Sequence, residues 1–381
     1  MERKKKILYL ITQSELGGAQ TYVLDLALSL KNDFDISIGF GEQGDKGGLA
    51  KKLKENEINY YPLPHLKRNI SPWHDFLAIF SIIGLIKKVK PDIVHLNSSK
   101  ISILGSLAGI ISKSKIINHK SKIIYTVHGW IFNEPLSGSK KSFYLHAEKF
   151  TAKFKNKIIC VSKFDYDTAL KNKIAPKEKL VTIHNGIKPI NLLSREEARK
   201  KLGIDNSDII IGSVAYLYKT KGFEYLIQAT KILDDTGINA KTIIIGEGKE
   251  REELENWINQ LNLKNKIILT GKIDNASELL KAFDVYVSSS VKEGLSYTII
   301  EAMTTGLPIV ATCIGGSPEL ISDNEEGLLV DPANPEKLAQ AITKLINNSE
   351  LSNRLGQNAK EKAEKEFTLE KMIAKTKEFY K

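Results

Sequence analysis

The sequence predicts an α/β fold made of two doubly wound domains. Short β-branched segments alternate with amphipathic segments of helical period, a pattern typical of parallel sheets covered by helices on both faces. The chain has 381 residues, more than one hydrophobic core usually serves, so two domains are expected. Hydrophobic residues make up 42% of the chain and charged residues 27%, as in ordinary globular proteins. The composition is therefore sufficient for two packed cores.

Two series of predicted strands support this division. Each series holds about six apolar runs, which indicates one doubly wound sheet per series. The first series lies at residues 6–12, 36–40, 92–98, 122–129, 157–162 and 180–186. The second series lies at residues 209–217, 241–248, 266–271, 285–290, 308–312 and 327–330.

The domain boundary is expected between the two series. Asn185-Gly186 favours a turn, and Pro189 interrupts regular structure. We therefore predict an N-terminal domain at residues 1–189 and a C-terminal domain that begins at residue 190. Ligands of open α/β sheets bind beyond the carboxyl ends of the strands, so we expect the two domains to face each other across a cleft that holds the site.

The chain is basic, with a formal net charge of +11. Its lysines are spread along the whole sequence and no recognition motif accompanies them, so nucleic acid is not an expected partner. Two interpretations of the charge stay open: a generally lysine-rich surface, and attraction to phosphates or to an anionic membrane face. The two cysteines, Cys160 and Cys313, predict neither a disulfide nor a zinc site, which fits a reducing cytoplasm. No apolar run approaches the length of a membrane span.

Two D-x-D sequences resemble metal ligands but are interpreted differently here. Asp33 and Asp35 lie at a predicted helix-to-strand connection, and Asp165 and Asp167 lie at a predicted helix start. Residues two apart on a helix do not share a face, so we interpret these side chains as solvated loop or cap carboxylates. No metal site is predicted.

Phosphate-binding elements are predicted after the first strand of each domain. Gly17 and Gly18 form a turn before a helix, where backbone amides and the helix N-terminus favour an anion. Lys219 and Lys221 follow the first strand of the second domain, where ammonium groups can meet a diphosphate. A glycine that only closes a turn and a solvated lysine before a helix are the alternatives.

The segment KEGLSYTIIEAMTTG, residues 292–306, places Glu293 and Glu301 eight positions apart. Glu293 lies on a turn after a strand, and a helix is predicted from about Ser296. Free amides at the start of this helix would bind a phosphate, whereas carboxylates accept hydrogen bonds from hydroxyls. The amides concerned belong to Gly294, Leu295 and Ser296. This combination suits a sugar nucleotide; a glutamate favoured by the helix dipole, with an ordinary surface glutamate, is the alternative.

Over nearly its full length the chain resembles the family-4 glycosyltransferases of GT-B fold, which have two Rossmann-like domains facing across a cleft. The E-x7-E pair with its embedded glycine, followed by a Gly-Gly-x-Pro-Glu segment, is the most specific part of the resemblance. The segments that carry it are GGAQ (17–20), KPDIVHLNSSK (90–100), HGW (128–130), VSKF (161–164), NGI (185–187), KGFEYLIQA (221–229), GEG (246–248), EGLSYTIIEAMTTGLPIVAT (293–312) and GGSPELI (315–321).

The resemblance implies an activity and its partners. The expected reaction is a retaining, metal-independent transfer of a hexose or N-acetylhexosamine from a nucleoside diphosphate sugar, UDP favoured, without a cofactor. Residues 190–365 would bind this donor, the N-terminal domain would bind the acceptor, and a helix at residues 366–381 would cross back to the N-terminal domain. The expected acceptor is a lipid-linked or cell-surface glycan, and the expected location is cytoplasmic, at the inner membrane face. The alternatives are a catalytically silent partner subunit and a UDP-sugar epimerase.

The resemblance also implies residue roles. Glu293 would face the donor sugar, Glu301 would bind the ribose hydroxyls, and His128 would reach the donor sugar. Lys221 and two helix-start amides would stabilise the departing diphosphate, and Gly18 would approach the phosphates or the acceptor. The expected catalytic residues are His128, Glu293 and Lys221. The expected donor-binding residues are Gly18, Lys219, Lys221, Gly294, Leu295, Ser296 and Glu301.

One position departs from the family pattern. Relatives commonly carry an arginine five residues before the lysine, and Tyr216 stands at that place here. Tyrosine cannot supply bidentate phosphate binding. We hypothesise that Lys219 replaces the lost charge and holds the diphosphate jointly with Lys221, provided that the loop between them is extended.

Acceptor-side residues are predicted in the first domain. Lys67, Arg68 and Trp73 lie in an irregular stretch that suits contact with a membrane surface and a lipid pyrophosphate. A second segment follows a strand and either binds a phosphate or forms a plain helix cap. The predicted acceptor-side residues are Gly17, Arg68, Ser98, Ser99 and Lys100.

A predicted helix within residues 140–157 carries an aromatic stripe. Its members are Phe143, Ala147, Phe150 and Phe154, with lysines around them. We interpret the stripe as a core-facing side with a solvated basic back, and insertion into a membrane is the alternative.

Overall fold

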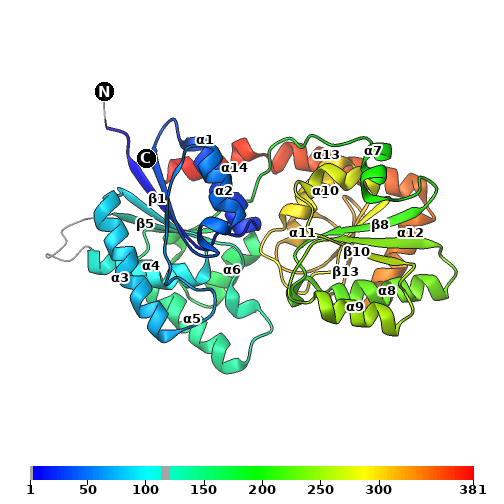
Figure 1. Cartoon of the computed structure of the whole chain (residues 1–381), viewed down its shortest axis with the longest axis horizontal. Coiled ribbons are helices and arrows are strands. Elements are labelled where there is room, and N and C mark those ends of the chain that lie inside the picture. The colour runs from blue at the N-terminus through cyan, green and yellow to red at the C-terminus, as the bar shows by residue number, and fades with distance from the viewer. Residues whose placement is uncertain (1–2, 113–120) are drawn as a thin grey trace. The chain divides into compact units, whose positions relative to one another are not determined.

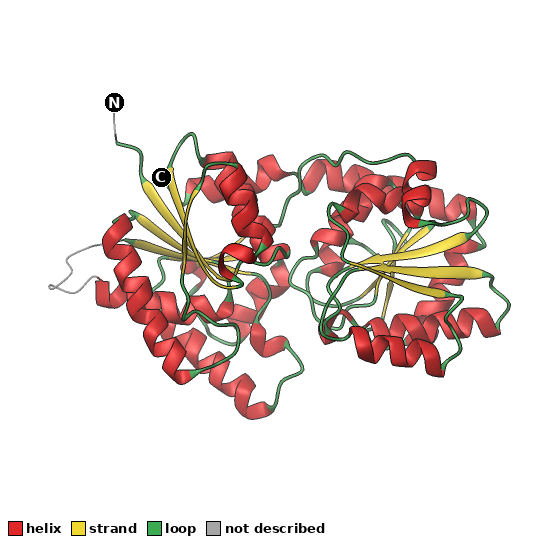
Figure 2. Cartoon of the chain, viewed as in Figure 1, coloured by secondary structure: helices red, strands yellow, loops and turns green. Residues whose placement is uncertain are grey.

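The computed structural model describes residues 3–112 and 121–381, and the chain divides into two compact units. Unit 1 comprises Met1–His184 and Met372–Lys381, and unit 2 comprises Asn185–Lys371. Each unit is a parallel sheet flanked by helices (Figures 1 and 2). The predicted α/β class with two doubly wound domains is therefore confirmed.

Unit 1 is built on a parallel sheet of seven strands in the order β3-β2-β1-β4-β5-β6-β7. Its strands are β1 (Lys6–Gln13), β2 (Asp35–Glu42), β3 (Asn59–Pro62), β4 (Ile93–Leu96), β5 (Lys122–Val127), β6 (Lys157–Cys160) and β7 (Leu180–Thr182). The sequence predicted all of these except β3. That strand, NYYP, lies at the edge of the sheet and is half-exposed, so it lacks the apolar run that marks the buried strands.

Helices cover both faces of this sheet. The strand order runs in opposite directions on either side of β1 and β4, so right-handed crossovers place α1 and α2 on one face and α3 to α6 on the other (Figure 1). The α-helices are α1 (Gly18–Leu30), α2 (Gly48–Glu55), α3 (Pro72–Val89), α4 (Ser99–Ser112), α5 (Gly138–Ala152) and α6 (Lys163–Lys171). Short 3₁₀ turns lie at η1 (Gly44–Lys46), η2 (Ile131–Asn133) and η3 (Lys177–Lys179).

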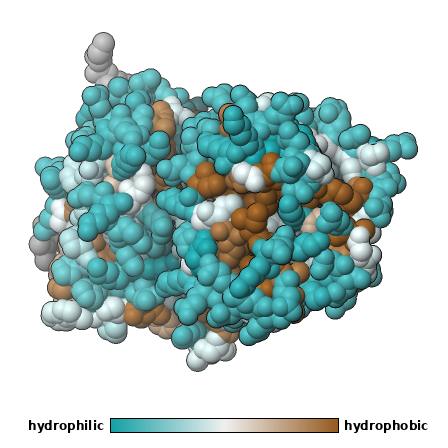
Figure 3. All heavy atoms as spheres, turned by 45° about the vertical axis from the view of Figure 1, so that its right-hand side comes forward, coloured by the Kyte–Doolittle hydropathy of each residue, from teal (hydrophilic) through white to brown (hydrophobic). Residues whose placement is uncertain are grey.

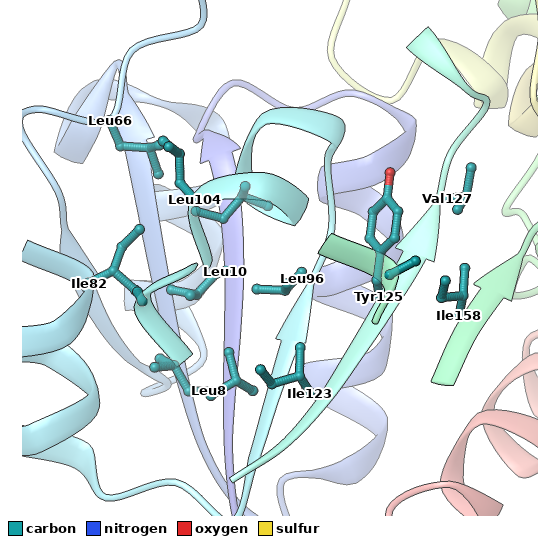
Figure 4. Close-up of a cluster of buried hydrophobic side chains, with 14 of the residues drawn as sticks. Leu8, Leu10, Leu66, Ile82, Leu96, Leu104, Ile123, Tyr125, Val127 and Ile158 are labelled. Carbon is teal, nitrogen blue, oxygen red and sulfur yellow. The ribbon is translucent and has the colours of Figure 1, made fainter. Parts of the chain in front are cut away.

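The core of unit 1 lies between the sheet and the layer formed by α3 and α4. Leucine, isoleucine and aromatic side chains from the strands meet side chains from these helices, as Figure 4 shows. Because strands of a parallel sheet are buried on both faces, their sequences are continuous apolar runs, and this is why the pattern predicted them. The residues labelled there are Leu8, Leu10, Leu66, Ile82, Leu96, Leu104, Ile123, Tyr125, Val127 and Ile158.

Unit 2 is built on a parallel sheet of six strands in the order β10-β9-β8-β11-β12-β13, and the sequence predicted all six. The strands are β8 (Ile209–Val214), β9 (Ala240–Ile245), β10 (Ile267–Gly271), β11 (Val285–Ser288), β12 (Ile309–Thr312) and β13 (Leu328–Val330). The α-helices are α7 (Arg195–Leu202), α8 (Phe223–Asp235), α9 (Arg251–Gln260), α10 (Tyr297–Thr305), α11 (Ser317–Leu320), α12 (Pro335–Ile346) and α13 (Ser349–Glu366). The 3₁₀ turns are η4 (Lys219–Lys221) and η5 (Ala276–Ala282).

The end of the chain, which follows the last helix α14 (Leu369–Glu378), is anchored in unit 1. The Tyr380 side chain is fully buried, and its hydroxyl lies 2.5 Å from Nδ1 of His95 on β4. Phe34 packs edge-on against the Tyr380 ring, with the ring centroids 5.8 Å apart. A buried polar contact thus fixes the penultimate residue to the centre of the sheet.

The predicted core-facing stripe of α5 is wrong. Phe143 and Phe150 are 57% and 53% exposed. The buried side of the helix carries Glu148 instead, whose Oε2 lies 2.8 Å from Nζ of the buried Lys155. Nζ of Lys155 also donates a hydrogen bond of 2.6 Å to Ser102. Amphipathic patterns assume that charges face water, and this pair violates the assumption because the Lys155 ammonium neutralises the Glu148 carboxylate inside the unit.

The buried pair makes a stability prediction. Glu148→Gln leaves the Lys155 ammonium without its counter-charge, so we expect the free energy of unfolding to fall by about 3 kcal/mol. Urea unfolding followed by tryptophan fluorescence measures this change. Replacing both charges with apolar residues, Glu148→Leu with Lys155→Met, should recover most of the loss.

The matched control is the exposed ion pair of Lys52 and Glu55 on α2, whose side chains are 47% and 45% exposed. Glu55→Gln should change stability by no more than about 0.5 kcal/mol, because water screens this pair. A loss in Glu148→Gln as small as that of the control would contradict the prediction.

Candidate active site

The site of unit 2 lies at the switch point of its sheet, where β8 and β11 are neighbours. The connections after these two strands run to opposite sides, which leaves a crevice at the carboxyl edge of the sheet. Lys221 follows β8, and Glu293 follows β11. Two loops far apart in the sequence therefore meet at this point.

Lys221 and Glu293 form an ion pair in which Nζ lies 2.6 Å from Oε1. The hydroxyl of Ser290 donates a second hydrogen bond of 2.6 Å to the same oxygen. The Lys221 and Glu293 side chains are 23% and 10% exposed, so solvent screens the pair only in part. The carboxylate is held in one orientation before any ligand binds. Sequence reasoning missed Ser290, although a run of three serines, of which the first ends β11, marked the place.

Backbone contacts fix the loops that carry this pair. The amides of Val291 and Lys292 donate to the carbonyl of Thr220 at 2.9 and 3.3 Å. Gly315 has φ +57°, and a Cβ at this residue would lie 2.1 Å from the carbonyl oxygen of Glu293. A glycine is therefore required where the segment after β12 touches the glutamate loop.

Helix α10 begins next to the pair, as predicted. Ser296 is its N-cap, and the hydroxyl accepts a hydrogen bond of 3.4 Å from the amide of Ile299. The first amides of a helix have no acceptor within the helix and lie at the positive end of its dipole, so this end favours an anion. Leu295 and Ser296 are 5% and 6% exposed.

Glu301 lies on the second turn of α10, and its charge affects Tyr286, which lines a pocket beside the ion pair. Burial raises the pKa of the Tyr286 phenol, and the charge of Glu301 adds to this rise. Tyr286 lines a small pocket together with both members of the ion pair. The lining residues are Ser213, Val214, Ala215, Lys221, Phe223, Tyr286, Ser288, Ser289, Ser290, Glu293 and Thr298.

The condition set for joint phosphate binding by Lys219 and Lys221, an extended loop between them, is not met. The segment forms the 3₁₀ turn η4, in which residues two apart point in directions roughly 120° apart. Lys219 is exposed and lies near Glu224; burial raises the pKa of that carboxyl, and the charge of Lys219 opposes the rise. Tyr216 stacks on Tyr218, with ring centroids 5.6 Å apart. The structure does not bring Lys219 to the pair of Lys221 and Glu293, and its role in donor binding stays a prediction.

A corresponding switch point in unit 1 lies between β1 and β4. The hydroxyls of Thr12 on β1 and Ser98 after β4 are 2.6 Å apart, which ties the two strand ends together. Gly17 is the N-cap of α1 and, having no side chain, leaves the first amides of this helix uncapped. Helix α1 begins at Gly18, and this glycine is exposed.

His128 follows β5 at the same edge of the unit 1 sheet. Its ring meets the edge of Tyr22, with centroids 4.9 Å apart. Trp130, two residues further on, is buried and donates a hydrogen bond of 2.8 Å from Nε1 to the carbonyl of Asp165. Asp165 was predicted to be a solvated loop or cap carboxylate at a helix start. It does lie in the first turn of α6, but the predicted solvation is wrong: it is buried and accepts a hydrogen bond of 3.0 Å from Ser162, the N-cap. The backbone amide of Trp130 also donates a hydrogen bond of 3.4 Å to Oδ1 of Asp165, so this carboxylate helps to fix the segment that carries His128.

A buried polar network extends from the chain end to this histidine. Nε2 of His95 lies 2.7 Å from the hydroxyl of Thr126, which lies 3.3 Å from that of Tyr22. Burial, and to a smaller degree the charge of His128, lowers the pKa of His95 to about 3. His95 is therefore neutral, donating from one nitrogen and accepting at the other, and Tyr380 holds its second nitrogen.

The family is shown by comparison with known proteins. Residues 16–189 match the family described as Glycosyltransferase Family 4, and residues 194–362 match Glycosyl transferases group 1. An uncharacterized glycosyltransferase of Methanocaldococcus jannaschii is 30% identical over 376 residues, which cover 96% of this chain and 94% of that protein. This chain is a family-4 glycosyltransferase.

Two further proteins resemble this glycosyltransferase over almost their whole length. The UDP-Gal:alpha-D-GlcNAc-diphosphoundecaprenol alpha-1,3-galactosyltransferase of Escherichia coli is 29% identical, over 99% of this chain and 97% of that protein. The structure of HepE from Anabaena with UDP and glucose has a TM-score of 0.84 at 21% identity, over 99% of both chains. The two Rossmann-like sheets are those of the GT-B fold.

The predicted acceptor-side lysine of the glycosyltransferase is already neutralised. Nζ of Lys100 lies 2.5 Å from Oδ1 of Asp75 and 2.5 Å from the carbonyl of Asn69. This contact favours the alternative in which Ser99 and Lys100 begin α4 without binding a phosphate. Arg68 is exposed, and its backbone amide donates to Glu42 at 2.5 Å. An acceptor role for Arg68 stays a prediction.

Within residues 3–112 and 121–381, no cluster of three or more histidine, cysteine, aspartate or glutamate side chains could hold a metal ion. None of the helices in this described part is both long and apolar enough to cross a membrane.

Gly315 provides a test of the geometry of the glutamate loop. Gly315→Ala should displace Glu293, because its Cβ would meet the Glu293 carbonyl at 2.1 Å. We expect glycosyl transfer to fall at least about tenfold, as small misplacements of catalytic groups are costly. Turnover and thermal unfolding are measured on the same preparation.

Gly203 is the matched control, because it has φ +67° with open space around its Cβ position. Gly203→Ala introduces the same backbone strain, about 1 kcal/mol, away from the site. Equal turnover in the two variants would contradict a positioning role for Gly315.

Proposed function

We propose that this glycosyltransferase moves a hexose or N-acetylhexosamine from a UDP-sugar to a lipid-linked glycan acceptor and retains the anomeric configuration. The observation that carries the proposal is the cluster of Lys221, Glu293 and Ser290 beside the N-terminus of α10. One cation and a helix N-terminus suit a diphosphate, and the fixed carboxylate suits a hydroxylated sugar.

The chemistry assigned to this cluster is stabilisation of a leaving diphosphate. As the bond between the anomeric carbon and the phosphate oxygen breaks, negative charge grows on the diphosphate. Lys221 and the amides of Leu295 and Ser296 would meet this charge from fixed positions, which lowers the barrier without reorganisation. No metal or cofactor is part of the proposal, because cation and amides supply the charge stabilisation that a metal would otherwise give.

The roles of the two glutamates follow from their positions. Glu293 would accept a hydrogen bond from a hydroxyl of the donor sugar while Ser290 keeps the carboxylate oriented. Glu301, on the second turn of α10, would accept hydrogen bonds from the ribose. A carboxylate accepts such bonds but repels phosphate, so glutamates and amides would divide the donor between them.

Retention follows if the acceptor attacks from the face that the diphosphate leaves. The acceptor oxygen then bonds to the anomeric carbon, the bond to the phosphate oxygen breaks, and the departing oxygen takes the acceptor's proton. From unit 1, His128 would contact the donor sugar, and the uncapped start of α1 at Gly18 would approach phosphate. The network behind Tyr22 would keep the His128 ring in place.

The comparisons support the choice of UDP and of a lipid-linked acceptor. The name of the Escherichia coli relative combines UDP-Gal with a diphosphoundecaprenol-linked acceptor, and HepE was solved with UDP and glucose. We extend both properties to this chain and place its reaction at the cytoplasmic face of a membrane, where a lipid-linked acceptor is within reach.

The decisive experiment offers the purified protein a panel of UDP-, GDP- and ADP-sugars with and without a polyprenyl diphosphate N-acetylglucosamine acceptor. We expect transfer or slow donor hydrolysis with a UDP-sugar only, an unchanged rate in excess chelator, and an unchanged anomeric configuration by NMR. Release of an epimerised UDP-sugar without acceptor would indicate an epimerase, and no turnover with any donor would favour a silent partner subunit.

Lys221→Ala tests the assignment of the diphosphate site. Removing the one cation in the cluster should lower turnover by about 10²–10³-fold, the size of effect seen when one oxyanion-stabilising donor is lost. Lys219→Ala should have a much smaller effect if η4 keeps this lysine away from the pair. Lys200→Ala, an exposed lysine on α7, is the control. Equal losses in Lys219→Ala and Lys221→Ala would restore the hypothesis that the two lysines share the diphosphate.

A further inference from the structure

Exposed aromatic side chains are concentrated on two helices of unit 1. The face of the molecule seen in Figure 3 is mainly hydrophilic, with hydrophobic residues gathered in patches. A single exposed apolar residue needs no explanation, but a group of large ones on adjacent helices indicates an interaction surface. The exposed fractions are 68% for Trp73, 53% for Phe76, 55% for Phe80, 57% for Phe143 and 53% for Phe150. We call these five residues the aromatic surface.

The α3 part of the aromatic surface is a continuous stripe. Trp73, Phe76 and Phe80 follow one another at spacings of three and four residues, so they share a face of the helix. The ring centroids are 6.3 Å apart for Trp73 and Phe76, and 4.9 Å apart for Phe76 and Phe80. The opposite side of α3 packs into the core through Ala78, Ile82 and Ile86. Helix α3 is therefore apolar on both sides, although only one side is covered.

Helix α5 has the inverse of the usual arrangement. Phe143 and Phe150 are two turns apart on its exposed side, whereas its buried side carries the ion pair of Glu148 and Lys155. A helix that only needed a water-soluble outer face would place these residues the other way round. Hydrophobic burial within unit 1 does not account for the positions of the two phenylalanines.

The two stripes lie on the same layer of unit 1. Helices α3 and α5 both pack against α4 on one face of the sheet (Figure 1). Polar contacts tie both helices to α4: Nζ of Lys100 on α4 lies 2.5 Å from Oδ1 of Asp75 on α3, and the hydroxyl of Ser102 on α4 donates a hydrogen bond of 2.9 Å to Glu148 on α5. Asp75 lies two residues after Trp73, and Glu148 lies between Phe143 and Phe150 in the sequence, so α4 connects the helices that carry the two stripes.

The charge around the aromatic surface is positive. Exposed lysines lie at both ends of the stripes: Lys87 and Lys88 on α3, Lys140 and Lys141 on α5, and Lys153 just after α5. The two helices contain one carboxylate each. Asp75 is paired with Lys100 and is 18% exposed, and Glu148 is paired with Lys155 and is 1% exposed.

We propose that the aromatic surface and its flanking lysines bind the surface of an anionic lipid bilayer. The rings would lie at the level of the headgroups, and the ammonium groups would contact lipid phosphates. A second copy of the chain is a poorer occupant, because a two-fold contact would place lysines of equal charge against each other. The inference rests on the proposed function for its biological sense, since an enzyme held on the bilayer meets a lipid-linked acceptor there.

The test is sedimentation of the full-length protein with vesicles of phosphatidylcholine, with and without phosphatidylglycerol. We expect binding to the anionic vesicles and release by salt. Phe76→Ser with Phe150→Ser should lower the partition coefficient by about tenfold or more, and Lys140→Glu with Lys141→Glu should do the same for anionic vesicles.

Matched controls lie elsewhere on the chain. Ile268→Ser removes an apolar side chain of unit 2 that is 41% exposed, and Lys51→Glu with Lys54→Glu reverses exposed lysines on α2. Both controls should bind vesicles like the unaltered protein. Circular dichroism and thermal unfolding verify that every variant is folded.

Donor hydrolysis without vesicles separates this inference from the proposed function. Aromatic-surface variants should hydrolyse UDP-sugar at the unaltered rate while losing vesicle binding. An active protein that ignores anionic vesicles would overturn the membrane surface and leave the proposed function intact. Vesicle binding without any turnover would support the membrane surface and contradict the proposed function. Variants that change the oligomeric state, with vesicle binding unchanged, would also overturn the inference in favour of contact between copies.

Discussion

The ion pair between Lys221 and Glu293 joins the two loops on which the site of unit 2 depends. Its members are 72 residues apart in the sequence, and the switch point between β8 and β11 brings their loops together. Ser290 holds the same carboxylate oxygen, and Gly315 leaves room for the Glu293 backbone. Because these contacts exist before any ligand binds, the positive and negative groups of the site are preorganised. Donor binding would exchange part of this internal pairing for contacts with phosphate and sugar.

A second ion pair determines which side chains of α5 lie on the surface of unit 1. Glu148 and Lys155 are buried together in unit 1, and the aromatic residues Phe143 and Phe150 lie on the exposed side of α5. Buried charges are tolerated where each satisfies the other, so the helix does not need an apolar inner face. The ion pair on the buried side of α5 and the phenylalanines on its exposed side are therefore linked features of one helix.

Much of the fold could be predicted from the sequence, because buried parallel strands are continuous apolar runs. That rule found every strand except β3, whose tyrosines and proline lie at an open edge. The start of α10 was also predicted from the sequence: a helix was expected from about Ser296, and Ser296 is its N-cap. Predictions of which side chains face water failed for Asp165 and for the aromatic stripe of α5. Both errors have one cause: a polar group was assumed to face water, whereas a partner from another element satisfied it inside.

The sequence by itself determined the class of fold, the family and the residue types at the strand ends. These properties depend on local periodicity and on motifs that are contiguous along the chain. Only the tertiary structure decided which of these residues meet: Lys221 forms an ion pair with Glu293, and Lys100 is neutralised by Asp75. Pairing of charges depends on distances between elements, and a 3₁₀ turn of three residues at η4 is enough to change it.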